Sequence, residues 1–167
     1  MNIDLKKLSQ KQKDEFFMGK ALEEAQIALE YSDWPIGCVV VLNDKIISKG
    51  RNKVYSLKNK IHHAEIEALN KASKILSKDG EQATLYTTYE PCPMCVGAIL
   101  LNHIGRIVYG PDLDGSGGIY LINNKPKRFT EPRYSITLTS GVLNKECSIL
   151  FKKGKPTQKI ISIIKNK

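Results

Sequence analysis

Residues 83–102 read ATLYTTYEPCPMCVGAILLN, and this stretch decides the fold. Its first part, residues 83–88, is rich in the β-branched and aromatic side chains that favour a strand. Its second part, residues 93–102, is apolar and carries Pro93 near its first turn, which is typical of a helix N-terminus. A strand that leads directly into a helix is characteristic of layered α/β proteins.

The segments on either side of this stretch continue the pattern. Apolar periodicity predicts helices over residues 15–31, 63–77 and 141–153. Apolar runs predict four more strands, over residues 36–42, 45–50, 106–109 and 134–139. Asn43-Asp44 predicts a tight hairpin turn between the first two of these strands. We therefore expect an α/β domain of three α-β-α layers, in which helices cover both faces of a mixed five-stranded sheet.

Three side chains that bind zinc well stand at the starts of two predicted helices. His63 begins one helix, and Cys92 and Cys95 begin the next with the spacing Cys-x-x-Cys. A redox dithiol would account for the cysteines but not for the histidine. One histidine and two thiolates leave the fourth position of a tetrahedral Zn²⁺ open to water, which is typical of a catalytic site. The sequence therefore predicts a catalytic zinc site.

Glu65 lies two residues after His63 and is the candidate proton carrier. Zinc lowers the pKa of bound water to roughly 7. A carboxylate that is not itself a ligand can take a proton from that water and deliver it elsewhere. The alternative for Glu65 is an ordinary solvated glutamate on a helix.

These residues match His-x-Glu followed by Pro-Cys-x-x-Cys, the signature of zinc nucleobase deaminases. From about residue 16 to residue 151, the chain resembles the cytidine/deoxycytidylate deaminase superfamily. Within it, the chain looks most like the tRNA adenosine deaminases, and also like the yeast-type cytosine deaminases. The other segments that carry the resemblance are Trp34-Pro35-Ile36-Gly37, Gly50-Arg51-Asn52 and residues 85–90, 104–110 and 141–147.

The resemblance implies a zinc-dependent hydrolase that removes the amino group of a nucleobase, with Glu65 moving protons. It also implies a set of contacts with the base: the Asn52 side chain, a wall at Pro35 and Ile36, a backbone amide near Ala64 and a carbonyl near Glu90. Asn52 has the alternative of capping a turn. Trp34 is expected either at the pocket or in the core. The family likeness further implies a homodimer.

The positive charge of the chain is concentrated near its C-terminus. The net charge is +9, and residues 121–167 alone hold eleven basic and two acidic side chains, also a net of +9. Such a segment is expected to contact a polyanion, and a solvated lysine-rich surface is the alternative. The candidate phosphate contacts are Lys125, Lys127, Arg128 and Arg133. We assign residues 1–154 to the deaminase domain and residues 155–167 to a basic tail.

Three functions remain open at this point. The first is tRNA processing, in which an anticodon-loop adenosine is converted to inosine. The second is deamination of a free base, nucleoside or nucleotide, such as cytosine, guanine or deoxycytidylate. It is favoured by Trp34 and by the loop at residues 111–118, whose sequence differs from that of the corresponding loop in the tRNA enzymes. The third is a non-catalytic zinc protein that binds a partner, a role in which Glu65 would have no use.

The cellular compartment follows from the cysteines and the N-terminus. A Cys-x-x-Cys pair is typical of a metal or redox site in the cytoplasm, and the remaining Cys38 and Cys147 are expected to be buried. The first residues lack the apolar core of a signal peptide. We therefore expect a cytoplasmic protein without a membrane span.

Overall fold

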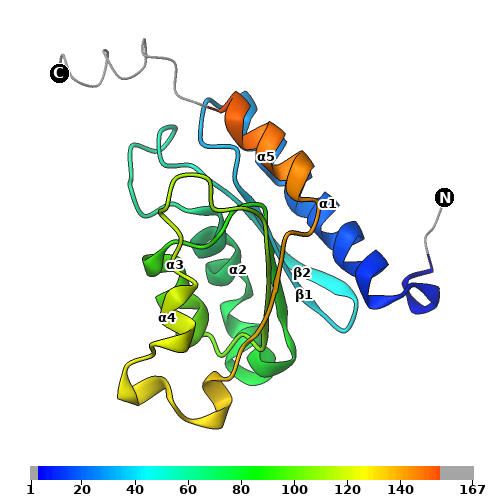
Figure 1. Ribbon diagram of the computed structural model, residues 1–167, viewed down its shortest axis with the longest axis vertical. Coiled ribbons are helices and arrows are strands. Elements are labelled where there is room, and N and C mark those ends of the chain that lie inside the picture. Colours follow the sequence, from blue (N-terminus) through cyan, green and yellow to red (C-terminus); the bar gives the residue numbers. More distant parts are fainter. Residues whose placement is uncertain (1–3, 155–167) are drawn as a thin grey trace.

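The computed structural model describes residues 4–154, which form a five-stranded sheet with helices on both faces (Figure 1). The strand order is β2-β1-β3-β4-β5. The strands are β1 (Gly37–Leu42), β2 (Lys45–Arg51), β3 (Thr84–Thr87), β4 (Arg106–Tyr109) and β5 (Thr137–Ser140). The α-helices are α1 (Gln10–Glu30), α2 (Ala64–Asp79), α3 (Pro93–Leu101), α4 (Tyr120–Asn123) and α5 (Asn144–Lys153).

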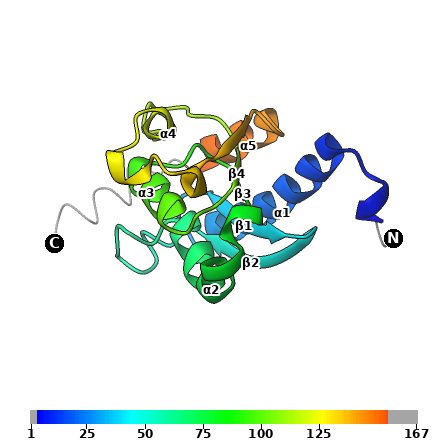
Figure 2. The same ribbon diagram turned by 90° about the horizontal axis from the view of Figure 1, so that it is seen from below.

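The sheet is mixed, as expected. Strand β1 runs antiparallel to both β2 and β3, whereas β3, β4 and β5 are parallel to one another. Helices α1 and α5 lie on one face of the sheet, and α2 and α3 lie on the other (Figure 2). This arrangement confirms the predicted three-layer α/β architecture.

Alternate residues of β1 supply two separate hydrophobic cores. Val39 and Val41 pack in the cluster that includes Phe17 and Met18 of α1. Cys38 and Val40 point the other way, into the larger cluster formed with α2 and α3. Successive side chains of a strand point to opposite faces, so a continuous apolar strand is what a sheet covered on both faces requires.

The predicted elements are all present, with ends that shift by a few residues. The largest shift is in the first helix, which starts at Gln10 because Ser9 and Gln12 form a capping box. The hairpin turn lies at Asn43 and Asp44, whose φ angles are 51° and 58°. The short helix α4 and the 3-10 turns Lys127–Phe129 and Pro132–Tyr134 were not predicted.

Within residues 4–154, no helix combines the length and the apolar character that a membrane span requires. The boundary at residue 154 remains a prediction, and the basic tail assigned to residues 155–167 lies outside the described residues.

Gly50 allows helix α2 to approach the sheet closely. A Cβ atom on Gly50 would lie 2.1 Å from the carbonyl oxygen of Ala64 and 2.6 Å from the backbone nitrogen of Ala68. Both atoms belong to the backbone of α2, so neither can move without the helix. Because Ala64 lies between His63 and Glu65, this contact fixes the start of α2, where two of the predicted site residues stand.

Replacing Gly50 by alanine is therefore expected to destabilise the protein by about 1–3 kcal/mol, the usual cost of overpacking a filled interior. Chemical denaturation of the zinc-loaded protein measures this change. Gly19→Ala is the matched control, because no atom lies within 4 Å of a Cβ added at that position of α1. The control should be neutral or stabilising by up to about 1 kcal/mol. An equal effect of both substitutions would contradict the close-approach argument.

Candidate metal centre and active-site pocket

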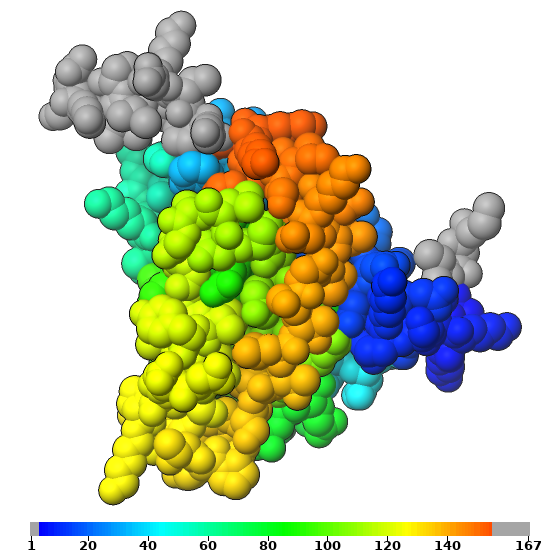
Figure 3. Space-filling model, in the orientation of Figure 1, coloured from blue at the N-terminus to red at the C-terminus, as the bar shows by residue number. Residues whose placement is uncertain are grey.

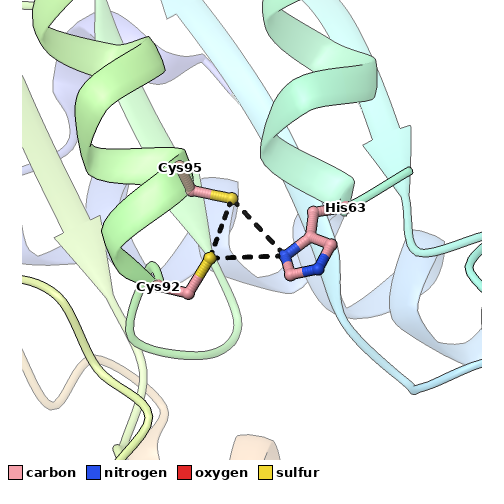
Figure 4. A group of neighbouring side chains, drawn as sticks. All are labelled: His63, Cys92 and Cys95. Carbon is pink, nitrogen blue, oxygen red and sulfur yellow. Dashed lines mark hydrogen bonds between the residues drawn. The ribbon is translucent and has the colours of Figure 1, made fainter. Parts of the chain in front are cut away.

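His63, Cys92 and Cys95 converge at one point between helices α2 and α3 (Figure 4). His63 Nδ1 lies 3.5 Å from Cys92 Sγ and 3.6 Å from Cys95 Sγ, and the two sulfur atoms are 3.6 Å apart. The three ligand atoms come from segments about 30 residues apart, and the parallel placement of α2 and α3 beside the sheet unites them. The structure thus brings together the zinc ligands expected from the sequence.

The donor atoms fit zinc in number, kind and spacing. Zinc binds thiolate at about 2.3 Å and imidazole at about 2.0–2.1 Å, so tetrahedral geometry would separate two sulfurs by about 3.8 Å and sulfur from nitrogen by about 3.6 Å. The three observed separations, 3.5 Å, 3.6 Å and 3.6 Å, are close to these values. Among the described residues 4–154, no fourth side chain joins this group of ligands, which leaves one position open for water or substrate.

The N-terminus of α3 and the neighbouring donors favour the thiolate form of Cys92. His63 is the N-cap residue of α2, and Cys92 is the N-cap residue of α3. A hydrogen bond from the Cys95 thiol and another from the His63 ring lower the pKa of Cys92 to about 4. A thiolate is thereby present at neutral pH, which is the form that binds a metal.

Glu65 lies beside this centre and is buried, with 3% of its surface exposed. Its Oε1 accepts a hydrogen bond from Thr87 Oγ1 at 3.1 Å, and its Oε2 lies 3.5 Å from Cys95 Sγ. Burial raises the pKa of Glu65. Because Glu65 is held in the interior and lines the pocket, it is not the solvated helix glutamate that the sequence left open as the alternative.

Asn52 follows the end of β2 and also lines the pocket, with 2% of its surface exposed. Its Oδ1 accepts a hydrogen bond from the backbone N–H of Val54 at 3.1 Å. Because that backbone group can only donate, the bond identifies the oxygen of the amide and leaves Nδ2 for the pocket. Asn52 therefore caps a turn and faces the site at the same time.

The pocket has a volume of about 420 Å³ and opens over His63, Glu65 and Cys92. Aromatic rings form much of its wall. Phe151 of α5 stacks on Trp34 at 5.3 Å between ring centroids and on Tyr89 at 4.2 Å. Trp34 thus belongs to the pocket, which decides between the two placements expected for it.

The other residues expected at the base have different positions. Ile36 lines the pocket, whereas Pro35 and Ala64 are buried behind its surface. Glu90 lines the pocket, and its Oε1 accepts a hydrogen bond from the backbone N–H of Ile119 at 3.1 Å. Its side chain therefore anchors the loop that follows β4 against the site.

That loop brings a third carboxylate to the pocket, after those of Glu65 and Glu90. Asp114 lines it and accepts hydrogen bonds from Tyr89 Oη and from the backbone N–H of Ser116, both at 3.0 Å. The bonds with Ser116 lower the pKa of Asp114, so this side chain is ionised at neutral pH. Asp114 belongs to the 111–118 loop, which the sequence analysis singled out as a departure from the tRNA enzymes.

The four basic residues proposed as phosphate contacts do not line the pocket. They lie in the segment between α4 and β5, at the opposite end of the molecule from the end of α5 (Figure 1). Lys125 Nζ donates a hydrogen bond to the Tyr134 carbonyl at 2.8 Å, and Arg133 forms an ion pair with Glu131 at 3.0 Å. Arg128 stands over the ring of Phe129. Lys127 is exposed.

Sequence reasoning missed several residues that line the pocket, among them Tyr55, Lys60 and Phe151. Phe151 occupies an apolar position of a predicted helix, which is also the pattern of a core residue. Tyr55 and Lys60 lie in an irregular loop without periodicity. The lysines in that loop were the available signal, since residues 53–60 contain three of them and no acid.

Comparison with known families and proteins agrees with this geometry. The sequence profile of the family described as "Cytidine and deoxycytidylate deaminase zinc-binding region" matches residues 11–111. The tRNA-specific adenosine deaminase of Bacillus subtilis (strain 168) is 37% identical over 137 residues, which cover 80% of this chain and 83% of that protein. The enzyme of the same name from Streptococcus pyogenes serotype M1 is 33% identical over 155 residues, or 87% of each chain.

Solved structures show the same fold. A structure from a study of A-to-I editing by deaminases acting at the wobble position of transfer RNA superimposes with a TM-score of 0.67 and 32% identity. The match covers 81% of this chain and 98% of that one. The protein NE0047, solved in complex with 2,6-diaminopurine, gives a TM-score of 0.66 at 26% identity, covering 84% of this chain and 80% of that one.

Proposed function

The chain belongs to the cytidine and deoxycytidylate deaminase family, defined by its zinc-binding region, and we propose that it deaminates an adenosine in the anticodon loop of tRNA to inosine. The buried Glu65 beside three zinc ligands is the observation that supports the chemistry. The likeness to bacterial tRNA-specific adenosine deaminases over most of both chains supports the substrate.

The reaction replaces the amino group on the ring carbon of the base with the oxygen of water, and ammonia leaves. Bound by His63, Cys92 and Cys95, zinc supplies the Lewis acidity that makes water a sufficient nucleophile at neutral pH. Within this chain, Glu65 is the group that takes the proton of the water. It passes this proton to the ring nitrogen. It then takes the second proton from the oxygen that has added to the ring carbon and passes it to the amino group, which leaves as ammonia.

The environment of Glu65 suits this exchange of protons. A carboxylate in bulk water has a pKa near 4.3 and holds a proton poorly at neutral pH. Burial raises the pKa of Glu65 toward the working pH, where accepting and returning a proton cost similar free energy. Thr87 Oγ1 donates to Oε1, whereas Oε2 lies on the side of the metal ligands, 3.5 Å from Cys95 Sγ.

The remaining pocket residues hold the base. Asn52 Nδ2 is the donor available to a ring nitrogen or a ribose oxygen, and Ile36 and the rings of Trp34 and Phe151 provide apolar walls. The backbone N–H of Ala64 and the carbonyl of Glu90 remain proposed contacts with the base. Ala64 is buried and does not line the pocket surface.

A substrate panel tests the proposed function directly. The zinc-loaded protein is incubated with an adenosine-containing anticodon stem-loop, cytosine, guanine, cytidine and deoxycytidylate, and ammonia and product base are measured. We expect inosine in the RNA and no turnover of the small compounds. Turnover of a small compound alone would contradict the tRNA proposal. Zinc binding without ammonia release from any substrate would favour the non-catalytic alternative.

One observation favours the second candidate, a deaminase of free bases. The ionised carboxylate of Asp114 lines the pocket and can accept hydrogen bonds from ring N–H and amino groups. Guanine offers both groups on one edge, whereas the corresponding edge of adenine carries no ring N–H. The guanine arm of the panel therefore tests this candidate.

We also propose that two copies of the chain form a homodimer in the cytoplasm. Helix α3 and the adjoining α4 expose large apolar side chains, namely Met94, Leu101 and Tyr120, at 38%, 56% and 58%. Exposed large apolar side chains are enriched at protein interfaces when they gather in one patch. Sedimentation at micromolar concentration distinguishes the dimer from an 18.7 kDa monomer.

A further inference from the structure

We propose that the RNA backbone binds at the rim of the pocket, through Lys58, Lys60 and Lys152, rather than at the basic run 125–133. We call these three residues the rim lysines. The inference rests on the proposed tRNA function and adds the surface by which the substrate is held. The RNA that binds there is the single-stranded loop on either side of the reacting base. The phosphates of this loop are the anions that contact the three lysines.

The rim lysines belong to the two segments that frame the pocket. Lys60 lines the pocket itself, and Lys58 lies in the same loop as the lining residues Val54 and Tyr55. Lys152 directly follows Phe151, which lines the pocket from the end of α5. The loop and the end of α5 lie at the same end of the molecule (Figure 3). We expect a nucleotide that enters the pocket to contact both segments.

The rim lysines are available for phosphate. All three are exposed, and within residues 4–154 none of them forms an ion pair. Their neighbour Lys53 differs, because its Nζ lies 2.7 Å from the Glu67 carboxylate. Among the described pocket-lining residues, Lys60 is the one lysine or arginine, whereas Glu65, Glu90 and Asp114 are acidic. Within the described pocket, a phosphate therefore meets a single cationic side chain, that of Lys60.

The basic run is less suited to the same task. Lys125 and Arg133 already bind groups of their own segment, and Arg128 stands over Phe129. The segment that holds the basic run also lies at the opposite end of the molecule from the end of α5 (Figure 1). A charge there attracts a polyanion over a long range, but it does not position the nucleotides next to the reacting base.

The rim also carries the aromatic surface that single strands require. Trp34 and Tyr55 are partly exposed, line the pocket and lie 6.4 Å apart between ring centroids. Sites for single-stranded nucleic acid combine lysines that follow the backbone with rings on which the bases stack. A base paired in a duplex could not reach these rings, so the geometry selects an open loop.

Two sets of substitutions separate the rim from the basic run. The first is Lys58→Gln, Lys60→Gln and Lys152→Gln together, and the second is Lys127→Gln with Arg128→Gln. Each is compared with the unaltered zinc-loaded chain for kcat and KM on the anticodon stem-loop between 0.05 and 0.5 M salt. These concentrations span roughly the range over which phosphate contacts change affinity strongly. A third set, the rim lysines replaced by arginine, preserves the charge.

We expect the glutamine rim variant to raise KM by about 10- to 50-fold at low salt, with little change in kcat. The slope of log affinity against log salt should fall by about 2, since each phosphate contact on a single strand contributes roughly 0.7. The arginine variant should keep the slope, and the far-end pair should resemble the unaltered chain. Equal zinc content and circular dichroism exclude unfolding as the cause.

Two results would overturn the inference, and they are distinguishable. If the unaltered chain deaminates the RNA but the glutamine rim variant has the same KM and salt slope, the rim inference is wrong and the proposed function stands. A loss confined to the far-end pair would assign the phosphates to the basic run. If the unaltered chain deaminates only a free base, the proposed function and the rim inference both fail.

Discussion

Replacing Glu65 by glutamine is expected to lower kcat by about 10²–10⁴-fold, the range contributed by a positioned proton carrier. Glutamine has nearly the same shape and can still accept the hydrogen bond from Thr87 Oγ1 through its amide oxygen. It cannot take a proton from water at neutral pH. Because His63, Cys92 and Cys95 are untouched, zinc content should remain unchanged. The measurements are inosine formation at saturating RNA and metal analysis of the same sample.

The matched control for this substitution is Glu81→Gln. Glu81 is exposed and follows the far end of α2, so it carries the same chemical change away from the site. We expect the control to retain full activity. A Glu65→Gln protein that kept more than a tenth of kcat would show that another group moves the protons. The ionised pocket carboxylate Asp114 would then be the first candidate.

The architecture could be predicted because its signals are local. Each strand is a short apolar run, and the long helices carry an apolar stripe, so composition and spacing indicate the type of each element. The Asn43-Asp44 pair likewise predicts a tight hairpin turn by itself. The segment 119–134 could not be predicted in the same way. Ile119, Ile122 and Tyr134 are buried against the core of α2 and α3, so its short turns depend on contacts with residues distant in the sequence.

The zinc centre could be predicted for a different reason. His63, Cys92 and Cys95 are rare residue types whose chemistry restricts their use, and their spacing is preserved by the helix starts that carry them. The residues of the pocket wall are not restricted by their chemistry in this way. Trp34, Tyr89 and Phe151 form one stack from three separate segments, and each alone is an ordinary apolar residue. Their meeting depends on the placement of α5, which no sequence spacing reveals.

Charge gave the least reliable guide to position. The C-terminal excess of basic residues suggested phosphate contacts at Lys125, Lys127, Arg128 and Arg133, and that assignment stays a prediction. Net charge reports attraction over the whole surface and not which end of the molecule faces a ligand. In the fold, the loop that contains Lys60 reaches the pocket although it lies outside the C-terminal segment 121–167.

Replacing Cys95 by alanine is expected to abolish zinc binding and, with it, deamination. The substitution removes one of three protein ligands and leaves only His63 and Cys92, which cannot hold the metal tightly. Metal analysis should find zinc falling from about one ion per chain to near zero. The chain should still fold, because the packing of the rest of the hydrophobic core does not depend on the metal. Activity should fall below detection even when excess zinc is added.

Removing the metal with a chelator tests the same assignment of zinc ligands without a measurement of activity. A metal that binds only the folded chain stabilises it by about 4 kcal/mol when present at a thousand times its dissociation constant. Chelation should therefore lower the unfolding temperature of the unaltered protein and leave that of Cys95→Ala unchanged. Cys147→Ala is the matched control, since Cys147 is also a buried free cysteine but packs against α1 instead. That control should bind zinc and respond to the chelator. A Cys95→Ala protein that still bound zinc and still responded would show that the metal is held elsewhere.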